Sequence, residues 1–390
     1  EQAGHTVLLV DGHLENLSIS VISDRIAAFQ PDFVVVTTAP SYLFWRCAPP
    51  ELRVPKLLVQ ALRPLGGTFV AIGPHASTTP QATLSKLAVD AVILGEPEAV
   101  LPQLADRGDW RSLTSVGYWQ NDEVVVQGGS YVTDMSTLPA LQWPSELIQR
   151  HTHHHHRFDT HPTTPAAEME TSRGCPYHCS FCAKENFRNG YRRRPLPVLL
   201  EELDGLIAQG VEYIYFIDEI FLPHQALLQA LVDRPIQFGI QTRIDLWNRD
   251  MLTLLGKAGC VSIEAGVESI STAGRQLLDK NCKLTTDELS DRLIYAKQHV
   301  PFVQANLLDS QLDDPEAIAA WRDHLQHHGV WANKPVPLFA YPGSPDYVKR
   351  WGFPDDQAWE RAHADYLTAY SNFSDIQEEN PLPLAQLERL

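Results

Sequence analysis

Three of the cysteines in this 390-residue chain fall within eight residues, Cys175, Cys179 and Cys182, with the spacing C-x3-C-x2-C. Thiolate sulfur is a preferred ligand of iron–sulfur clusters, zinc and copper(I), so the spacing points first to a metal. Three ligands on one loop can hold three corners of a [4Fe–4S] cube and leave the fourth iron open to a small molecule. The alternatives are unconnected buried thiols or a zinc site, although no second paired cysteine motif supplies the fourth zinc ligand.

The surroundings of these cysteines resemble a known family. A strand-like stretch, residues 168–172, precedes them, and the aromatic Phe181 stands directly before Cys182. In this context the motif is similar to the signature of radical S-adenosylmethionine (SAM) enzymes. The resemblance implies a [4Fe–4S] cluster held by the three cysteines, SAM on its open iron, and an external electron donor of the flavodoxin or ferredoxin type. Reductive cleavage of SAM would then give a 5′-deoxyadenosyl radical.

Strand-like and helical stretches alternate after the cysteines, which is typical of a parallel sheet with crossover helices. The expected strands after the first, at 168–172, are 213–219, 236–243, 260–269, 301–309 and 335–340. Six repeats predict a partial (β/α)6 TIM-type barrel, the radical SAM core, instead of a closed barrel of eight strands. In such a fold the carboxyl ends of the strands face the ligand.

Polar residues stand at two of these strand ends. Asp218 and Glu219 are similar to an acidic pair of cobalamin-type family members, where a carboxylate would accept a hydrogen bond from the SAM amino group. Arg243 matches the family's arginine that pairs with the SAM carboxylate, and the alternative is a structural salt bridge.

The fourth expected strand ends in a stretch that resembles the G-x-E-S element of the family. Glu268 and Ser269 would therefore approach the SAM ribose, with Glu264 as a weaker candidate. A basic patch that includes Arg192, Arg193 and Arg194 follows the cysteines. It would pair with an anionic group of SAM, corrin or substrate, or it is a solvated turn.

The first 130 residues predict a second sheet. Strand-like runs at 5–11, 32–38, 68–73 and 90–95 alternate with helical stretches, as in a Rossmann-like parallel-sheet domain. Two loops after these runs, Gly73-Pro74-His75-Ala76 and Gly95-Glu96-Pro97-Glu98, resemble the G-G-P-H-A and G-E-x-E loops of cobalamin-binding domains fused to radical SAM enzymes. The resemblance implies cobalamin as a third cofactor, and a degenerate scaffold domain is the alternative.

Two further elements are similar to those of cobalamin domains in general. His13 lies in a loop resembling D-x-H-x-x-G and would be a lower ligand of cobalt. The alternative is that His13 is a polar loop residue that binds no metal. Ser41 begins an S-x-L element that would approach the nucleotide tail. Two positions depart from the pattern, because Asn16 replaces the glycine of the first loop and Pro74 the second glycine of a G-G pair.

A histidine run lies in the stretch that joins the two predicted domains. Histidine is a common metal ligand and transfers protons near neutral pH. The candidates for substrate contact or acid–base catalysis are His153, His154, His155 and His156. A polar linker is the alternative. The expected organisation is a cobalamin-binding-type domain (1–130), a His-rich linker (131–167), the radical SAM core (168–349) and a short helical C-terminal cap (350–390).

Composition bounds the partners. With 31 basic and 48 acidic residues the net charge is −17, which argues against a broad nucleic-acid or anionic membrane surface. No apolar run approaches the roughly 20 residues of a membrane span. The first residues lack a signal-peptide pattern, and an oxygen-sensitive cluster fits a reducing cytoplasm.

Together these patterns predict a cobalamin-dependent radical SAM enzyme. The resemblance implies methylation of an unactivated carbon in a small-molecule or biosynthetic-intermediate substrate, by way of the 5′-deoxyadenosyl radical and methylcobalamin. The alternatives are a radical rearrangement, cyclisation or epimerisation without methyl transfer, and a non-catalytic iron–sulfur protein.

Overall fold

The computed structural model describes residues 3–39, 50–107, 110–151, 165–370, 386, 388 and 389. The chain divides into two compact units, here called the first and the second unit. The first contains residues 1–133, 181–189 and 339–390, and the second contains 134–180 and 190–338. By this division the C-terminal segment, residues 339–390, groups with the N-terminal residues.

The first unit is built on a five-stranded sheet of order β1-β2-β3-β4-β5. The first three strands are parallel, and β4 and β5 add an antiparallel hairpin at one side. The strands are β1 (Phe33–Thr37), β2 (Thr68–Ile72), β3 (Ala91–Ile93), β4 (Val116–Gln120) and β5 (Glu123–Gln127). The helices are α1 (Ile19–Phe29), α3 (Arg53–Leu62), α4 (Pro74–Thr78), α5 (Pro80–Leu87), α6 (Val100–Arg107), α14 (Pro345–Trp351) and α15 (Ala358–Tyr370). The Rossmann-like parallel arrangement expected from the sequence is confirmed.

One predicted strand of this unit is wrong. Residues 5–11 form no strand, and the side chains of Val7 and Leu9 are each 54% exposed. A β-branched run becomes a strand only where a neighbour completes its backbone hydrogen bonds. Within the described ranges the sheet ends at β1, so the apolar pattern of residues 5–11 was wrongly interpreted as a paired strand.

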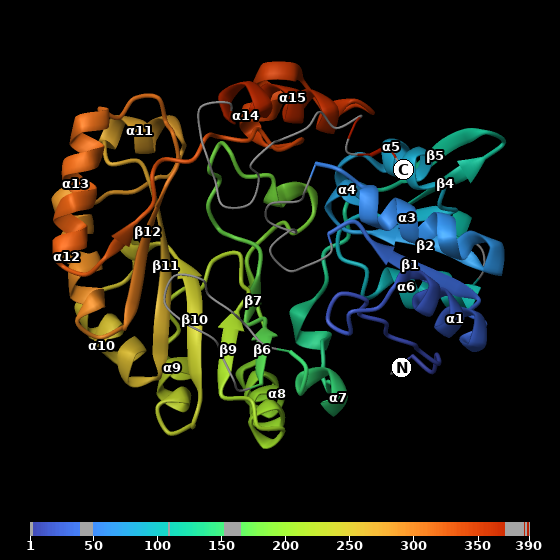
Figure 1. Ribbon diagram of the computed structural model, residues 1–390, viewed down its shortest axis with the longest axis horizontal. Coiled ribbons are helices and arrows are strands. Elements are labelled where there is room, and N and C mark those ends of the chain that lie inside the picture. Colours follow the sequence, from blue (N-terminus) through green and yellow to red (C-terminus); the bar gives the residue numbers. More distant parts are fainter. Residues whose placement is uncertain are drawn as a thin grey trace. The chain divides into compact units, whose positions relative to one another are not determined.

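The second unit is a six-stranded, all-parallel sheet of order β13-β12-β11-β10-β9-β6 (Figure 1). This order confirms the partial barrel. The strands are β6 (Ala166–Met169), β9 (Tyr213–Phe216), β10 (Gln237–Thr242), β11 (Cys260–Glu268), β12 (Phe302–Leu307) and β13 (Trp331–Ala332). A two-stranded ribbon pairs β7 (Ser172–Arg173) with β8 (Arg192–Arg193). The helices are α7 (Ser145–Ile148), α8 (Leu196–Ala208), α9 (Gln225–Leu231), α10 (Arg249–Lys257), α11 (Thr272–Leu277), α12 (Thr286–Lys297) and α13 (Pro315–His327).

The last strand of the barrel lies earlier than the sequence suggested. It is β13, and the predicted stretch 335–340 adds only an isolated bridge between Leu308 and Val336. Pairing is confined to Val336, whose N donates to Leu307 O at 3.1 Å and whose O accepts from Asp309 N at 2.8 Å.

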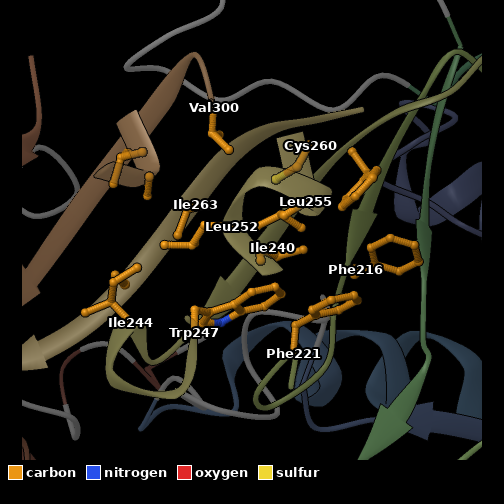
Figure 2. Packing of buried hydrophobic residues seen from close by; sticks show 14 of the residues in the cluster. Phe216, Phe221, Ile240, Ile244, Trp247, Leu252, Leu255, Cys260, Ile263 and Val300 are labelled. Atoms are coloured by element: carbon orange, nitrogen blue, oxygen red, sulfur yellow. The ribbon is translucent and has the colours of Figure 1, made fainter. Parts of the chain in front are cut away.

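The helices cover one face of this sheet. Alternate residues of each strand, such as Ile240 and Ile263, pack against Leu252 and Leu255 of α10 in one hydrophobic core (Figure 2). Because side chains alternate between the two faces of a strand, the residues between these apolar positions lie on the opposite, inner face. In the part of the chain that is described, no helix is both long enough and apolar enough to cross a membrane.

Candidate functional site

The cysteine loop begins directly after β7, at the carboxyl side of the barrel sheet. Cys175, Cys179 and Cys182 are all partly exposed and none forms a disulfide. Within the described ranges, no three His, Cys, Asp or Glu side chains already surround a point as a single metal ion requires. Three thiols in one accessible loop are nevertheless the donor set that an iron–sulfur cluster uses, so the residue types present fit that cofactor.

Two acids from the end of β9 hold the start of this loop. Asp218 is buried and accepts hydrogen bonds from Thr171 N at 2.7 Å and from the hydroxyl groups of Thr171 and Ser172. Glu219 accepts a hydrogen bond from Gly174 N at 2.9 Å, just before the first cysteine. Burial raises the pKa of the Asp218 carboxyl to about 6. Both acids thus position the loop, and their contact with SAM stays a prediction.

Arg243 braces the same loop from β10. Its guanidinium lies over the ring of Tyr177, 4.0 Å from the centroid, and Nη2 donates to Asp245 Oδ2 at 2.8 Å. Nε donates to the other carboxylate oxygen of Asp245 at 3.1 Å. Nη1 is buried and has no hydrogen-bond partner in the described residues. A buried donor without a partner is costly, so this atom is ready to bind an acceptor such as a carboxylate.

The carboxyl end of β11 carries the next pair. Glu268 has a left-handed backbone, with φ +68°, and its Oε1 accepts from Lys280 Nζ at 2.7 Å. Ser269 is buried, and its hydroxyl donates to Asp313 Oδ1 at 2.8 Å. Both predicted ribose contacts are therefore at the carboxyl edge of the sheet, as expected, but their observed contacts are within the protein, and the ribose contacts stay predictions.

The inner face of the barrel sheet is polar. Gln241 of β10, Glu264 of β11 and Gln304 of β12 occupy matching positions in the strand register. The side chain of Gln304 is 3% exposed and donates to Asn306. This row gives the inside of the barrel hydrogen-bonding groups at one level, below the strand ends that carry Arg243 and Glu268.

The contacts of Arg194 show the role of one arginine of the predicted basic patch. Arg194 is buried and forms an ion pair with Glu202 at 2.6 Å. Its guanidinium also donates to the backbone oxygens of Pro139 and Glu170. Arg194 is therefore neither a solvated turn residue nor an available anion site, and it joins α8 to the segments before it.

In the first unit the two glycine loops are tied together. Ser77 Oγ donates to Gly73 O at 2.9 Å and accepts from Gly95 N at 2.8 Å. Gly73 has φ +112°, and a β-carbon there would lie 2.7 Å from Thr38 Oγ1, so glycine is needed. Pro74 is buried in the first turn of α4. Both loops follow the carboxyl ends of parallel strands, where ligands of open sheets bind.

The other residues predicted to bind cobalamin differ in burial and in their contacts. His75 is buried and stacks on Trp359 of α15, with ring centroids 3.8 Å apart. Glu96 is also buried and accepts from Thr133 N at 3.1 Å. His13 is exposed in a turn before α1. The predictions for Ser41 and for the run His153, His154, His155 and His156 lie outside the described residues.

Three residues that the sequence left without a role take part in these contacts. They are Tyr177, Asp245 and Lys280. Tyr177 and Asp245 had a weak signal, since one is an aromatic inside the cysteine motif and the other lies two residues after Arg243. Lys280 had no such signal in the sequence, because the turn that carries it comes close to the cysteine loop only in the folded chain.

Comparison with known proteins defines the class of this site. Residues 169–321 match the Radical SAM superfamily, so this part of the chain is a radical SAM domain. A domain of this class implies a [4Fe–4S] cluster and SAM. Cys175, Cys179 and Cys182 are the cluster ligands that we expect.

The curated relatives extend beyond this domain. An uncharacterized methyltransferase of Pyrococcus horikoshii is 26% identical over 75% of this chain and 63% of its own length. An anaerobic magnesium-protoporphyrin IX monomethyl ester cyclase of Cereibacter sphaeroides is 24% identical over 75% of this chain and 49% of its own. The chain thus spans about half to two thirds of the length of these relatives.

Two solved structures share the fold across both units. The methyltransferase TsrM from Kitasatospora setae, with cobalamin and a [4Fe–4S] cluster bound, has a TM-score of 0.71 and 19% identity over 89% of this chain and 72% of its own. OxsB with aqua-cobalamin and SAM bound has a TM-score of 0.63 and 15% identity, over 91% and 60%. At this identity the likeness is one of fold.

Proposed function

We propose that this chain is a cobalamin-dependent radical SAM enzyme that transfers a methyl group to an unactivated carbon of a small-molecule or biosynthetic-intermediate substrate. The observation that carries the SAM part is Arg243, a buried guanidinium with a spare Nη1 donor beside the cysteine loop. The methyl-transfer part is supported by the methyltransferase relative and by the fold shared with TsrM.

The chain's own residues would act by binding and orientation. The cluster and SAM, when bound, supply a hydrogen-abstracting radical, and cobalamin supplies a methyl carrier. Arg243 would hold the SAM carboxylate, and Asp245 keeps the guanidinium in place for it. Asp218 and Glu219 fix the backbone before the first cysteine, so that the loop keeps one geometry through turnover. An external one-electron donor is required.

Cobalamin binding is supported by the first unit. The Gly73 and Gly95 loops leave the carboxyl ends of β2 and β3, and Ser77 locks them together. Such a rigid edge of a parallel sheet suits the face of a large planar cofactor. His75 is used by its stack with Trp359, so we assign it to shaping the loop and not to cobalt.

A radical cyclisation without methyl transfer is the second candidate. It is favoured by the magnesium-protoporphyrin IX monomethyl ester cyclases among the relatives, one of them from Cereibacter sphaeroides. The two candidates share the cluster and SAM and differ in the product, since methyl transfer adds one CH2 to the substrate and cyclisation does not.

The test begins with anaerobic reconstitution. We expect iron, sulfide and a cobalamin optical spectrum in the wild type, and 5′-deoxyadenosine after addition of SAM, substrate candidates and a strong reductant. Cys179→Ala should lose most of the iron, whereas the matched control Cys260→Ser, a buried thiol of β11, should keep it. A wild-type protein without iron and sulfide would overturn the proposal, and the product mass decides between methylation and cyclisation.

A further inference from the structure

A short turn after α11 lies against the cysteine loop. Ser180 N, in the residue after Cys179, donates to Leu278 O at 3.0 Å. Two residues further on is Lys280, between Asp279 and Asn281, whose backbones are both left-handed, with φ +48° and +50°. Aspartate and asparagine adopt this left-handed conformation more readily than other non-glycine residues, so the sequence suits a tight turn here. The turn therefore presents Lys280 to the loop in one orientation.

The ammonium of Lys280 is buried beside a single carboxylate. Its side chain is 3% exposed and Nζ lies 2.7 Å from Glu268 Oε1. The pair lies over Gly266, where a β-carbon would be 3.2 Å from Nζ and 2.5 Å from Oε1. Moving a charge away from water is costly unless another charge compensates it. Glu268 provides one such charge, and the fold keeps this position free of any larger residue.

The turn that carries this ammonium is hydrogen-bonded to the cysteine loop one residue after Cys179, through Ser180 N and Leu278 O. Lys280 therefore brings a positive charge, and Glu268 a negative charge, to this side of the loop. A cluster bound by thiolates gains one more negative charge when it takes up an electron, and nearby charges are among the factors that set its reduction potential.

We propose that Lys280 is a positioning residue of the iron–sulfur site, whose buried ammonium stabilises the reduced cluster and so raises its reduction potential, with Glu268 opposing it. The proposal rests on the proposed function, since it requires the cluster. The redox step is the uptake of one electron from an external one-electron donor, and no bond forms or breaks in the protein. The charges act most strongly because they are buried, where water does not screen them.

The test is a redox titration of the anaerobically reconstituted protein without SAM, followed by the electron paramagnetic resonance signal of the reduced cluster. At the wild-type midpoint potential, Lys280→Met should lower the ratio of reduced to oxidised cluster about tenfold, or ~59 mV for a one-electron couple. Lys280→Arg should restore it. Glu268→Gln should shift the ratio the opposite way, and the double variant should return close to the wild type.

Lys257→Met, at an exposed position near the end of α10, is the matched control and should leave the potential unchanged. An unchanged reduction potential in Lys280→Met with full iron content would overturn the proposal. The same holds if this variant binds SAM more weakly but keeps the wild-type potential. If Lys280→Met fails to load iron, Glu268→Gln decides, because an unshifted or lowered potential in that variant contradicts the proposed opposition. A wild type without any cluster would instead refute the proposed function.

Discussion

The guanidinium of Arg243 lies 4.0 Å from the ring centroid of Tyr177, so the end of β10 is joined to the residue midway between the first two cysteines. Arginine over an aromatic face gains electrostatic attraction in addition to packing, and the gain grows when water is excluded. The Arg243 side chain thus packs against the cysteine loop and keeps its Nη1 donor available beside it. Changes at Arg243 should therefore affect both loop geometry and SAM binding.

Arg243→Lys keeps the positive charge but removes the planar guanidinium. In the wild type this group binds both oxygens of Asp245 through Nε and Nη2 and still has Nη1 available for SAM. We expect SAM to bind the reconstituted variant at least ~10-fold more weakly, or ~1.4 kcal/mol, by isothermal titration calorimetry. Arg249→Lys, an exposed arginine over Tyr295, is the control and should bind SAM like the wild type. Equal affinity in Arg243→Lys would exclude the assigned contact.

The ionisation of Asp218 should make stability depend on pH. Burial raises its pKa from 3.8 to about 6, so between these values the folded state binds the proton more tightly than the unfolded state. Stability then falls as the pH rises through this window, by ~3 kcal/mol at about 1.36 kcal/mol per pKa unit, and levels off above it. Asp218→Asn does not titrate. Its free energy of unfolding relative to the wild type should therefore rise by that amount between about pH 4 and 7 in denaturant titrations.

Asp204→Asn is the control for this measurement. Its side-chain hydrogen bond from Arg234 lowers the pKa of Asp204, so the stabilising contribution is already complete above about pH 4. The difference from the wild type should stay flat from about pH 4 to 7, and small, because exposed pairs contribute little. A flat difference for Asp218→Asn as well would show that its carboxyl is ionised throughout.

The buried pair Arg194–Glu202 should be stabilising only as a pair. Arg194→Met leaves the Glu202 carboxylate buried without its partner, since both side chains are almost inaccessible. We expect a loss of ~3–5 kcal/mol in the free energy of unfolding. The double variant Arg194→Met/Glu202→Leu should recover most of this loss, because it removes the uncompensated charge as well. A double variant no more stable than the single one would contradict this account.

Trp359 should anchor α15 within the first unit. Its ring stacks on His75 and its Nε1 donates to Thr79 Oγ1 at 3.0 Å. Trp359→Ala should cost ~3–5 kcal/mol, and Trp359→Phe, which keeps an aromatic ring, mainly the hydrogen bond of ~1 kcal/mol. Thermal unfolding and limited proteolysis of the C-terminal segment would measure the loss. Phe353→Ala, at 86% exposure, should change neither.

Much of this architecture was predictable because its signals are local. The spacing of Cys175, Cys179 and Cys182 requires only that they share one loop, and alternating apolar runs identify parallel strands with crossover helices. Arg243 and Glu268 could be placed at the carboxyl edge because they end predicted strands. The run at 5–11 and the stretch at 335–340 were wrongly predicted as strands, since a strand forms only where a neighbouring strand pairs with its backbone over several residues.

The amino-acid sequence is enough to establish which chemical groups the chain can bring to a site: three thiols in one loop, and acids and an arginine at strand ends. The contacts that these groups make are visible only in the folded chain. Tyr177 lies under Arg243, Lys280 beside Glu268, and Trp359 on His75. The last of these contacts joins residues more than 280 positions apart. Such contacts depend on how the chain closes on itself in three dimensions, and no local pattern of hydrophobicity or spacing carries that information.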